Sequence, residues 1–373
     1  MLHRRAGFGA SWQQLKRDVA DGPEKSVARI IEGKSRENVL EDFEENSELL
    51  LKRAVLSRDI QRLSAWWILK MYLGPHAFAE RRTLMWHNHF ATSNQTIQNP
   101  LRMYRQNQIF RENAEGKFSD LLEKAIKDPT MLLWLNANDN RQGHPNENLG
   151  RELLELFSLG VGNYTEDDVK EAARALTGWT ANQMMRPLNQ NDPLSDDKDY
   201  VDKLKVRDHW HDPFDKTILG KTGSWDGDDL LKIVVEHPAT PKRLAWRICD
   251  ELFGEDVVST SAMEELASGL VKNELNLKWA YETVLNSELF FSQPNLKTRV
   301  APPETFVLGC LIALQTHAQP ASTLALASVL TNLGRSLFHP PNVGGWDGGR
   351  LWLNVRTMAV SYTHLTLPTI YSV

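Results

Sequence analysis

The run from Met85 to Phe90 contains a His-x-His pair, His87 and His89, and imidazole is a common ligand of divalent metal ions. On a strand, residues i and i+2 share a face, so both side chains could bind one ion. On a helix they point ~200° apart, so a shared ion would require the helix to end there. Residues 91–94 could provide that end. We predict a metal site, with packing or capping histidines as the alternative.

A second His-x-His pair, His209 and His211, lies in a polar stretch and is followed by Asp212. Imidazole and carboxylate ligands suit zinc, manganese or calcium, and the two histidines face the same way if the chain is extended. Loops hold functional residues more often than helices or strands do. These three side chains therefore predict ligands for a divalent metal cofactor, and the alternative is a polar surface turn.

Charged residues follow the start of an expected helix near Asn146. His144 and Asn146 are candidate site residues in the polar loop before it, and Glu147, Arg151 and Glu152 occupy its first turns. Carboxylates in such a row could act as general acid and base or bind a cation. We therefore predict these last three residues as the catalytic group. The alternative is a solvated face on which the arginine pairs with glutamates at i±4.

Tryptophan is abundant, with 12 residues, and its flat face favours sugar rings and cations. Most of the tryptophans occupy apolar helical positions that are typical of a core. Trp179 is a further candidate site residue, as is Trp346 in the run from Phe338 to Trp352. Four glycines and two prolines in that run specify a tight turn, so a structural role is the default interpretation.

The elements that position these residues are expected to be helices, because apolar residues recur at helical spacing along most of the chain. The clearest helix start is Thr165, which can form a capping box with Asp168, and Gly178 suits the end of that helix. Between residues 180 and 229 the periodicity disappears, which predicts a long irregular polar insertion. β-Branched patches are short, so we predict an all-α, multi-helix globular domain.

The composition predicts a single large helical domain over residues 1–360. The content of 41% hydrophobic and 24% charged residues is typical of globular proteins. Residues 361–373 change to a composition of threonine, leucine and proline, and we interpret them as a foreign tail derived from a cloning or sequencing adapter.

Charge and hydropathy argue against several partners. The 43 basic and 48 acidic residues give no electrostatic reason to expect nucleic acid. The pair Arg81-Arg82 is flanked by apolar residues and is interpreted as ordinary helix surface. No apolar run approaches the ~18 residues of a transmembrane helix, so we expect no integral membrane segment. Cys249 and Cys310 belong to no CxxC pair, which argues against a zinc knuckle.

Seven stretches of the chain carry a family resemblance. They are His3–Gly9, Trp86–Phe90, Gly143–Asn148, Arg151–Leu153, Gly162–Glu166, Ala173–Trp179 and Pro340–Trp346. In this order they resemble the bacterial family called domain of unknown function 1800. The resemblance implies an all-helical, exported protein, periplasmic or extracellular, with an uncharacterised sulfatase-like protein as a partner. No reaction is established for the family, so it supplies no catalytic residues.

Two functions are the main candidates, and a cytoplasmic role as a plain helical scaffold is a third option. The first is a metal-dependent hydrolase of an extracellular polymer, for which the histidine pairs and the carboxylates would activate water. The second is a non-catalytic secreted or cell-envelope protein that binds or supports a partner, with these motifs as buried polar networks. The two differ in geometry. The first is favoured if four side chains meet within ligand distance in one cleft, namely His87, His89, Glu152 and His211. If they scatter, the second is favoured.

Overall fold

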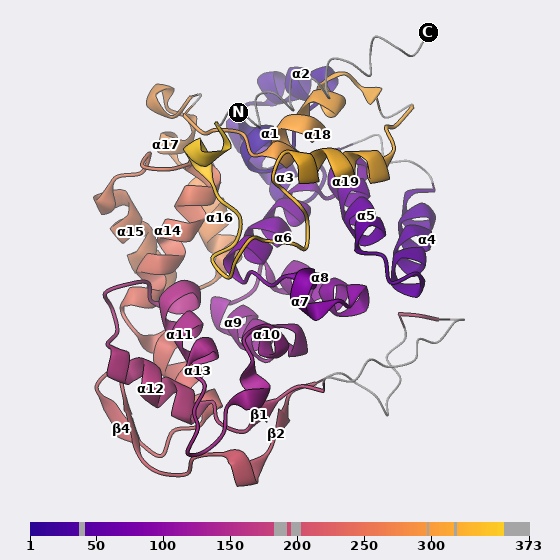
Figure 1. Cartoon of the computed structure of the whole chain (residues 1–373). Coiled ribbons are helices and arrows are strands. Elements are labelled where there is room, and N and C mark those ends of the chain that lie inside the picture. The colour runs from indigo at the N-terminus through magenta and orange to yellow at the C-terminus, as the bar shows by residue number, and fades with distance from the viewer. Residues whose placement is uncertain (37–41, 183–191, 195–202, 297, 317–318, 354–373) are drawn as a thin grey trace.

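Helices form most of the regular structure in the computed structural model of this chain (Figure 1). The structure describes residues 1–36, 42–182, 192–194, 203–296, 298–316 and 319–353. Within these ranges the β-structure consists of two antiparallel sheets of two strands each. The predicted all-α class is therefore confirmed, and the predicted foreign tail, residues 361–373, lies outside the described residues.

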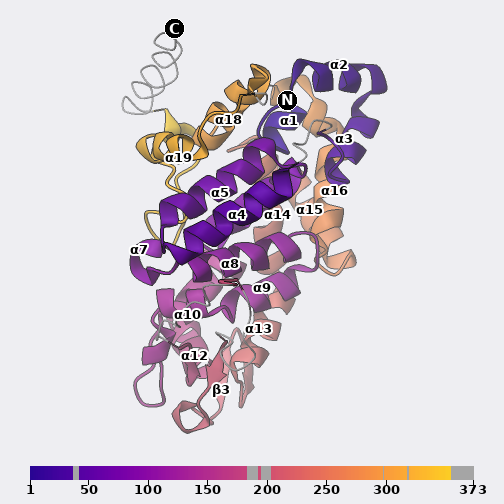
Figure 2. The same cartoon turned by 90° about the vertical axis from the view of Figure 1, so that its right-hand side faces the viewer.

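The N-terminal part of the chain forms short helices and then a group of longer ones. In chain order they are α1 (Leu2–Arg5), α2 (Trp12–Asp21), α3 (Pro23–Ile31), α4 (Phe43–Leu56), α5 (Ile60–Leu73), α6 (Ala77–His89), α7 (Asn94–Ile97), α8 (Pro100–Asn113), α9 (Phe118–Ile126), α10 (Pro129–Trp134) and the 3-10 turn η1 (Ala137–Asp139). Helices α4 and α5 lie side by side, and α19 (Thr323–Asn332) packs on α5 (Figures 1 and 2).

The second half continues with helices around the irregular region. They are α11 (Asn148–Glu152), the π-helical turn η2 (Leu153–Ser158), α12 (Glu166–Ala175), α13 (Gly227–Glu236), α14 (Ala239–Phe253), α15 (Thr260–Lys272), α16 (Leu277–Asn286), α17 (Glu288–Phe291), η4 (Gln293–Asn295), α18 (Pro303–Ala313) and η6 (Gly349–Trp352). The predicted capping box of α12 is present, because Thr165 accepts from the backbone of Asp168 and Asp168 accepts from the backbone of Thr165.

The region predicted to be irregular contains short strands. Strand β1 (Trp179–Thr180) pairs with β2 (Lys205–Val206), and β3 (Lys216–Ile218) pairs with β4 (Lys221–Gly223), with the 3-10 turn η3 (Asp208–Trp210) between the two sheets. Both sheets lie at the end of the molecule opposite α2 and α18 (Figures 1 and 2). Residues 183–191 and 195–202 of the predicted insertion lie outside the described residues.

Two groups of buried apolar side chains form the core, and α6 belongs to both. Met85 and Trp86 contribute to the larger group, which spreads over α9 to α16. Leu84 contributes to the smaller group, which includes α5, α18 and α19. Almost every residue of α6 is buried, its charged ones included. The central position of α6 therefore explains why polar side chains on this helix must find partners inside the protein.

Candidate functional site

His87 lies in the core among aromatic side chains. Its ring contacts those of Trp67, Phe110 and Phe338, with centroid distances of 4.7, 4.7 and 5.5 Å. The Asn107 side-chain amide donates to His87 Nε2 at 3.0 Å. Burial, with the nearby charge of Arg111, holds the pKa of His87 well below its usual value. His87 is therefore a neutral core histidine, which is the alternative that the sequence left open.

His89 is also buried, and α6 continues through it, so the two histidines do not share a face. His89 Nε2 lies 3.0 Å from the carbonyl oxygen of Phe157 in the π-helical turn and donates to it. Burial, with the charges of Arg247 and Arg243, holds the pKa of His89 well below its usual value. Among the described residues, no group of three or more His, Cys, Asp or Glu side chains is placed to bind a metal ion.

The two buried histidines predict that stability falls as the pH drops from about 7.5 to 5.5. Their pKa values are lower in the folded chain, so the unfolded chain binds protons that the folded chain does not. Their contribution is fully present above the unfolded pKa and is lost below it, with a slope of up to ~1.4 kcal/mol per pH unit for each histidine. Urea denaturation across this pH interval measures the slope. His89→Gln should reduce this slope, and an unchanged slope in that variant would contradict the assignment to the buried histidines.

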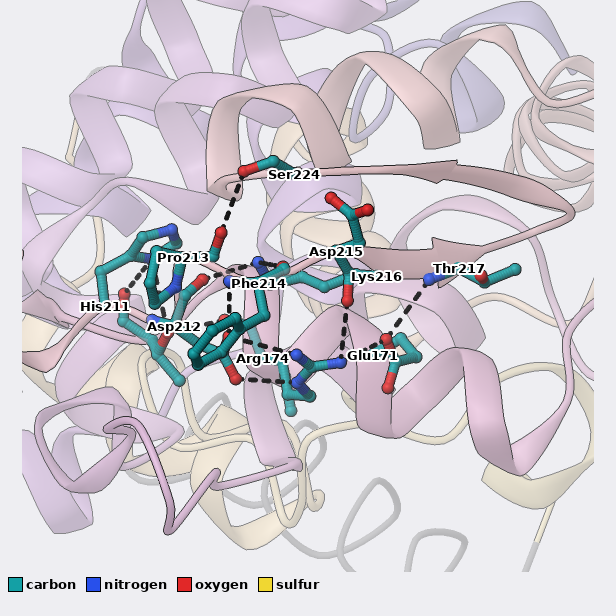
Figure 3. Close-up of polar contacts among 12 residues, drawn as sticks. Glu171, Arg174, His211, Asp212, Pro213, Phe214, Asp215, Lys216, Thr217 and Ser224 are labelled. Atoms are coloured by element: carbon teal, nitrogen blue, oxygen red, sulfur yellow. Dashed lines mark hydrogen bonds and ion pairs between the residues drawn. The ribbon is translucent and has the colours of Figure 1, made fainter.

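The second His-x-His segment is connected to α12 by hydrogen bonds and an ion pair (Figure 3). Arg174 donates to both carboxylate oxygens of Asp212, at 2.8 and 3.1 Å, and Thr177 Oγ1 accepts from the Asp212 backbone N–H at 2.8 Å. His211 Nδ1 lies 3.1 Å from the Thr177 carbonyl oxygen. Burial raises the pKa of Asp212, but the hydrogen bonds from Arg174 outweigh it and lower the pKa overall. This carboxylate is therefore already committed to an arginine.

The other members of that segment lie apart from any shared site. His209 is exposed and contacts the ring of Trp210 at a centroid distance of 5.9 Å. Lys216 is buried, and its ammonium group donates to the carbonyl oxygens of Asp212 and Phe214 at 2.7 and 2.8 Å. The segment is bonded to itself, to α12 and to Thr177 just after that helix, and it also bonds to Gln142 and Ser224. These contacts indicate a structural role for the segment.

The predicted catalytic group forms a surface ion-pair network. Arg151 donates to Glu147 at 3.0 Å and to both carboxylate oxygens of Glu166 at 2.7 and 2.9 Å. The i+4 spacing from Glu147 to Arg151 thus produces the ion pair that the alternative interpretation predicted. The third member, Glu152, forms no ion pair with this network in the part of the chain that the structure describes. Exposed pairs of this kind contribute only about 0–1 kcal/mol to stability.

The remaining residues near this helix have local roles. Glu152 is half-buried, and burial followed by repulsion from Glu155 raises its pKa. Asn146 accepts from the backbone N–H of Asn148 at 3.0 Å in the turn before α11, whose N-cap residue is Glu147 and has no side-chain cap. His144 is exposed in the tight turn that precedes the helix. The structure therefore does not bring these side chains together with His87 or the other histidines.

The two candidate tryptophans are both buried. Trp179 lies in β1 with its ring against Gly227, where any side chain would overlap it. Trp346 donates through its backbone N–H to Asn88 Oδ1 at 2.7 Å and through its indole N–H to the Ser336 carbonyl at 3.2 Å. Asn88, between the two histidines of α6, thus connects this helix to the glycine-rich C-terminal run.

A charged cavity of about 110 Å³ lies next to Trp346, between α6, α14 and the chain that leads to η6. Five of its lining residues are arginines: Arg81, Arg247, Arg299, Arg335 and Arg350. Five are acidic: Asp250, Glu251, Glu255, Glu304 and Asp347. Asn88 and Trp352 also line it. The concentration of ionisable groups in one concave place makes this cavity the candidate functional site.

In the buried part of the cavity two glutamates bind three arginines. Glu251 lies 2.8 Å from Arg81 and 3.0 Å from Arg299. Glu304 lies 3.3 Å from Arg81 and 3.4 Å from Arg335. Burial alone would raise the pKa of Glu251, but the surrounding arginines lower it to about 2. Both carboxylates are therefore parts of the wall that hold the guanidinium groups in place.

Arg247 and Asp250 form a looser pair in the same wall. Their nearest charged atoms are 3.9 Å apart, and Arg247 also donates to the Met85 carbonyl at 3.4 Å. Burial raises the pKa of Asp250. Counting the four inner arginines against Asp250, Glu251 and Glu304 leaves one more guanidinium than carboxyl group. The inner part of the cavity therefore carries an excess of positive charge.

Further positive charge lies behind this wall. Arg5 is buried and donates to the carbonyl oxygens of Leu252 and Phe253, at the end of α14, at 3.0 Å each. Burial lowers the pKa of Arg5 to about 10. Arg299 also has a pKa lowered to about 10, first by burial and then by repulsion from Arg81. Both shifts have the sign expected for guanidinium groups in a region of low dielectric constant, and for Arg299 the repulsion from Arg81 adds to the effect of burial.

The sequence did not predict this cavity. Arg81 and Arg82 were expected on an ordinary helix surface, and this was wrong, because Arg81 is only 1% exposed and Arg82 only 6%. The signal was present in the spacing, since Arg81 lies three residues after Phe78 and four before Met85, both in the core. A charged residue at a buried helical position needs partners, and here they come from α14 and α18.

The fold and the cavity define a mainly helical protein with a concave charged site that contains five arginines. The chain belongs to the family described as Protein of unknown function (DUF1800), whose model matches residues 1–367, and the resemblance seen in the sequence is confirmed. Neither curated proteins nor solved structures give a match in the comparisons. Over the described ranges, no helix is both long and apolar enough to cross a lipid bilayer.

Proposed function

We propose that this protein is a non-catalytic binding protein whose charged cavity holds an anionic group of its ligand. The observation that carries the proposal is the excess of guanidinium over carboxyl groups in the buried part of the cavity. Arginine suits carboxylate, sulfate and phosphate groups because its planar fork donates two parallel hydrogen bonds. A bound anion would neutralise the excess positive charge of the inner arginines in a region of low dielectric constant.

Unsatisfied donors support the same proposal. The Nε atoms of Arg81 and Arg247 are buried and have no hydrogen-bond partner in the part of the chain that the structure describes. A buried donor without a partner costs about 1–3 kcal/mol, so such groups usually have a structural or functional reason. Small shifts of these side chains toward an anion would give them partners. The buried arginines are thus prepared for a ligand of opposite charge.

The positions of the predicted metal ligands also favour a binding function over hydrolysis. A metal-dependent hydrolase would need the histidine pairs and Glu152 in one cleft. Instead, His87 and His89 lie among core aromatic rings, and His211 bonds to Thr177. The scatter of these groups removes the geometric support for the hydrolase hypothesis. The second hypothesis from the sequence, a binding protein, is the one that we retain.

The proposal includes export to the periplasm or the extracellular space and a sulfatase-like partner protein, both of which the family resemblance suggests. A protein that binds without catalysing a reaction leaves the chemistry to such a partner. Cell fractionation followed by affinity purification of the tagged full chain tests both points. Recovery in the cytoplasmic fraction, or a purified complex without a sulfatase-like protein, would contradict this part of the proposal.

Anion binding is expected to stabilise the chain, and Arg247→Gln is expected to weaken binding about 10- to 100-fold, since hydrogen bonds to charged groups contribute about 1.5–3 kcal/mol. A ligand at 100 times its Kd adds about 2.7 kcal/mol of stability. Acetate, sulfate and phosphate are titrated at constant ionic strength, with thermal unfolding and calorimetry as readouts. Arg243→Gln is the matched control, because Arg243 lies one turn earlier on α14 and does not line the cavity.

Two results would contradict the proposal that the cavity binds an anion. The first is the absence of any stabilisation by the three anions in the native chain. The second is an equal loss of binding in the Arg247 and Arg243 variants, because it would place the anions elsewhere on the surface. Arg350→Gln is a further variant for testing anion binding at the cavity. Arg350 is exposed at the edge of the cavity, so its replacement leaves the buried ion pairs intact.

A further inference from the structure

Three kinds of side chain meet at the charged cavity. Guanidinium groups occupy its buried part, the exposed carboxylates Glu255 and Asp347 lie at its edge, and the half-buried Trp352 forms part of its wall. Resting on the proposed function, we propose that the ligand is an acidic sugar residue, alone or at the end of a polymer. Its carboxylate or sulfate group would enter the cavity, and its ring would lie at the mouth.

The anionic group is assigned to the side of the cavity at Arg247. Glu251 and Glu304 each contact two arginines at 2.8–3.4 Å, so the guanidinium groups of Arg81, Arg299 and Arg335 already face carboxylates. Arg247 has its nearest carboxylate at 3.9 Å. It therefore retains the most capacity for a new ion pair, and its burial strengthens the interaction with a group that enters from solvent.

The volume of the cavity restricts what can enter. A cavity of about 150 Å³ holds one benzene molecule in a protein core, and the space here is about 110 Å³. A pyranose ring is bulkier than benzene, so it does not fit inside as a whole. A carboxylate or sulfate group with the adjacent carbon does fit. The ring that carries the group must then remain at the mouth of the cavity.

The mouth offers what a sugar ring requires. Trp352 lines the cavity with an aromatic side chain. Gly334, with φ +89°, makes room for its indole ring, because a Cβ atom at Gly334 would lie 3.3 Å from that ring. Indole faces are favourable surfaces for apolar C–H groups, which sugar rings carry on their faces. Trp352 is held within the wall of the cavity, so a ring stacked on it would keep its anionic substituent close to the arginines.

The two carboxylates at the edge favour a sugar ligand over a simple anion. Glu255 accepts a weak hydrogen bond from the Arg350 backbone N–H at 3.5 Å, and over the described ranges Asp347 has no hydrogen bond or ion pair. Ionised carboxylates only accept hydrogen bonds, so hydroxyl groups satisfy them whereas a bare anion is repelled. A ligand with an anionic group and neighbouring hydroxyl groups matches both the inner arginines and the outer carboxylates.

Calorimetric titration of the full chain with four probes tests the assignment. Glucuronate and glucose 6-sulfate carry both features, acetate carries only the anion and glucose only the ring. We expect one or both acidic sugars to bind at least about tenfold more tightly than acetate, and the preferred one identifies carboxylate or sulfate. Trp352→Leu should remove this advantage without changing acetate binding, and Trp352→Phe should restore part of it.

Trp246→Leu is the matched control, because Trp246 is an exposed tryptophan of α14 that does not line the cavity. Equal affinity for acetate and both acidic sugars, or an unchanged sugar affinity in Trp352→Leu, would overturn the acidic-sugar assignment while the anion site stands. If none of the anionic probes binds the native chain, the proposed function itself fails. Unfolding curves of each variant verify that a loss of binding does not reflect a loss of folding.

Discussion

Replacing Glu304 by alanine is expected to destabilise the protein by about 3–5 kcal/mol, the range seen when one partner of a buried ion pair is removed. Glu304 is 1% exposed and contacts both Arg81 and Arg335. Its loss would leave two buried guanidinium groups with less negative charge around them. The large effect therefore arises from the charge that remains, and not from the energy of the pair itself. Urea denaturation monitored by tryptophan fluorescence measures the change in the free energy of unfolding.

Two controls separate this cause from a general effect of lost contacts. Adding Arg335→Met to Glu304→Ala removes one of the uncompensated charges and should recover part of the lost stability. The exposed pair of Lys170 and Asp167 provides the surface comparison, and Asp167→Ala should change stability by less than about 0.5 kcal/mol. A loss at Glu304 as small as that at Asp167 would contradict a buried, mutually dependent charge cluster.

The parts of the fold that depend on near neighbours in the chain were predictable. The capping box of Thr165 and Asp168 spans three residues, and the turn contact between Asn146 and Asn148 spans two. Such contacts form wherever the local sequence supplies the right donor and acceptor, because few other residues take part. The all-helical class follows from the same kind of local evidence, the spacing of apolar residues along each helix.

The charged cavity could not be predicted in the same way, because its contacts are remote in sequence. Arg81 and Glu304 are 223 residues apart, and Asn88 and Trp346 are 258 apart. No local pattern specifies which helix meets which, so charged residues on α6 appear as ordinary surface residues until their partners are known. The spacing of Arg81 between the core positions Phe78 and Met85 was the available signal, and its interpretation required the tertiary contacts.

The histidine pairs show the opposite error, in which a local pattern suggested chemistry that the fold does not assemble. His-x-His spacing favours a shared ligand only on an extended chain, and α6 remains helical through His89. The helix continues because its residues fit the core on most sides, so the histidines are buried as packing groups. In the same motif the residue that reaches the candidate site is Asn88, which had no separate signal in the sequence.

His87→Ala is expected to destabilise the protein by about 2–4 kcal/mol, because it removes a ring from a packed aromatic cluster and leaves the Asn107 amide without its acceptor. His211→Ala should cost only about 1 kcal/mol, since His211 is half-buried and contacts Thr177 through one ring nitrogen. Denaturation curves give both values, and mass-spectrometric metal analysis of the same samples measures metal content. We expect the metal content to be equal in the native chain and in both variants.

His87→Phe distinguishes packing from metal binding. A phenylalanine keeps an aromatic ring in the cluster but has no nitrogen, so it should retain most of the stability that alanine loses, less the cost of the unpaired Asn107 amide. A metal ligand would respond in the opposite way, because alanine and phenylalanine abolish coordination alike. The core assignment would be refuted if the native chain held nearly one metal ion and both the His87 and the His211 variants lost it. That result would support the metal hypothesis. The order expected from the aromatic contacts is native, then phenylalanine, then alanine.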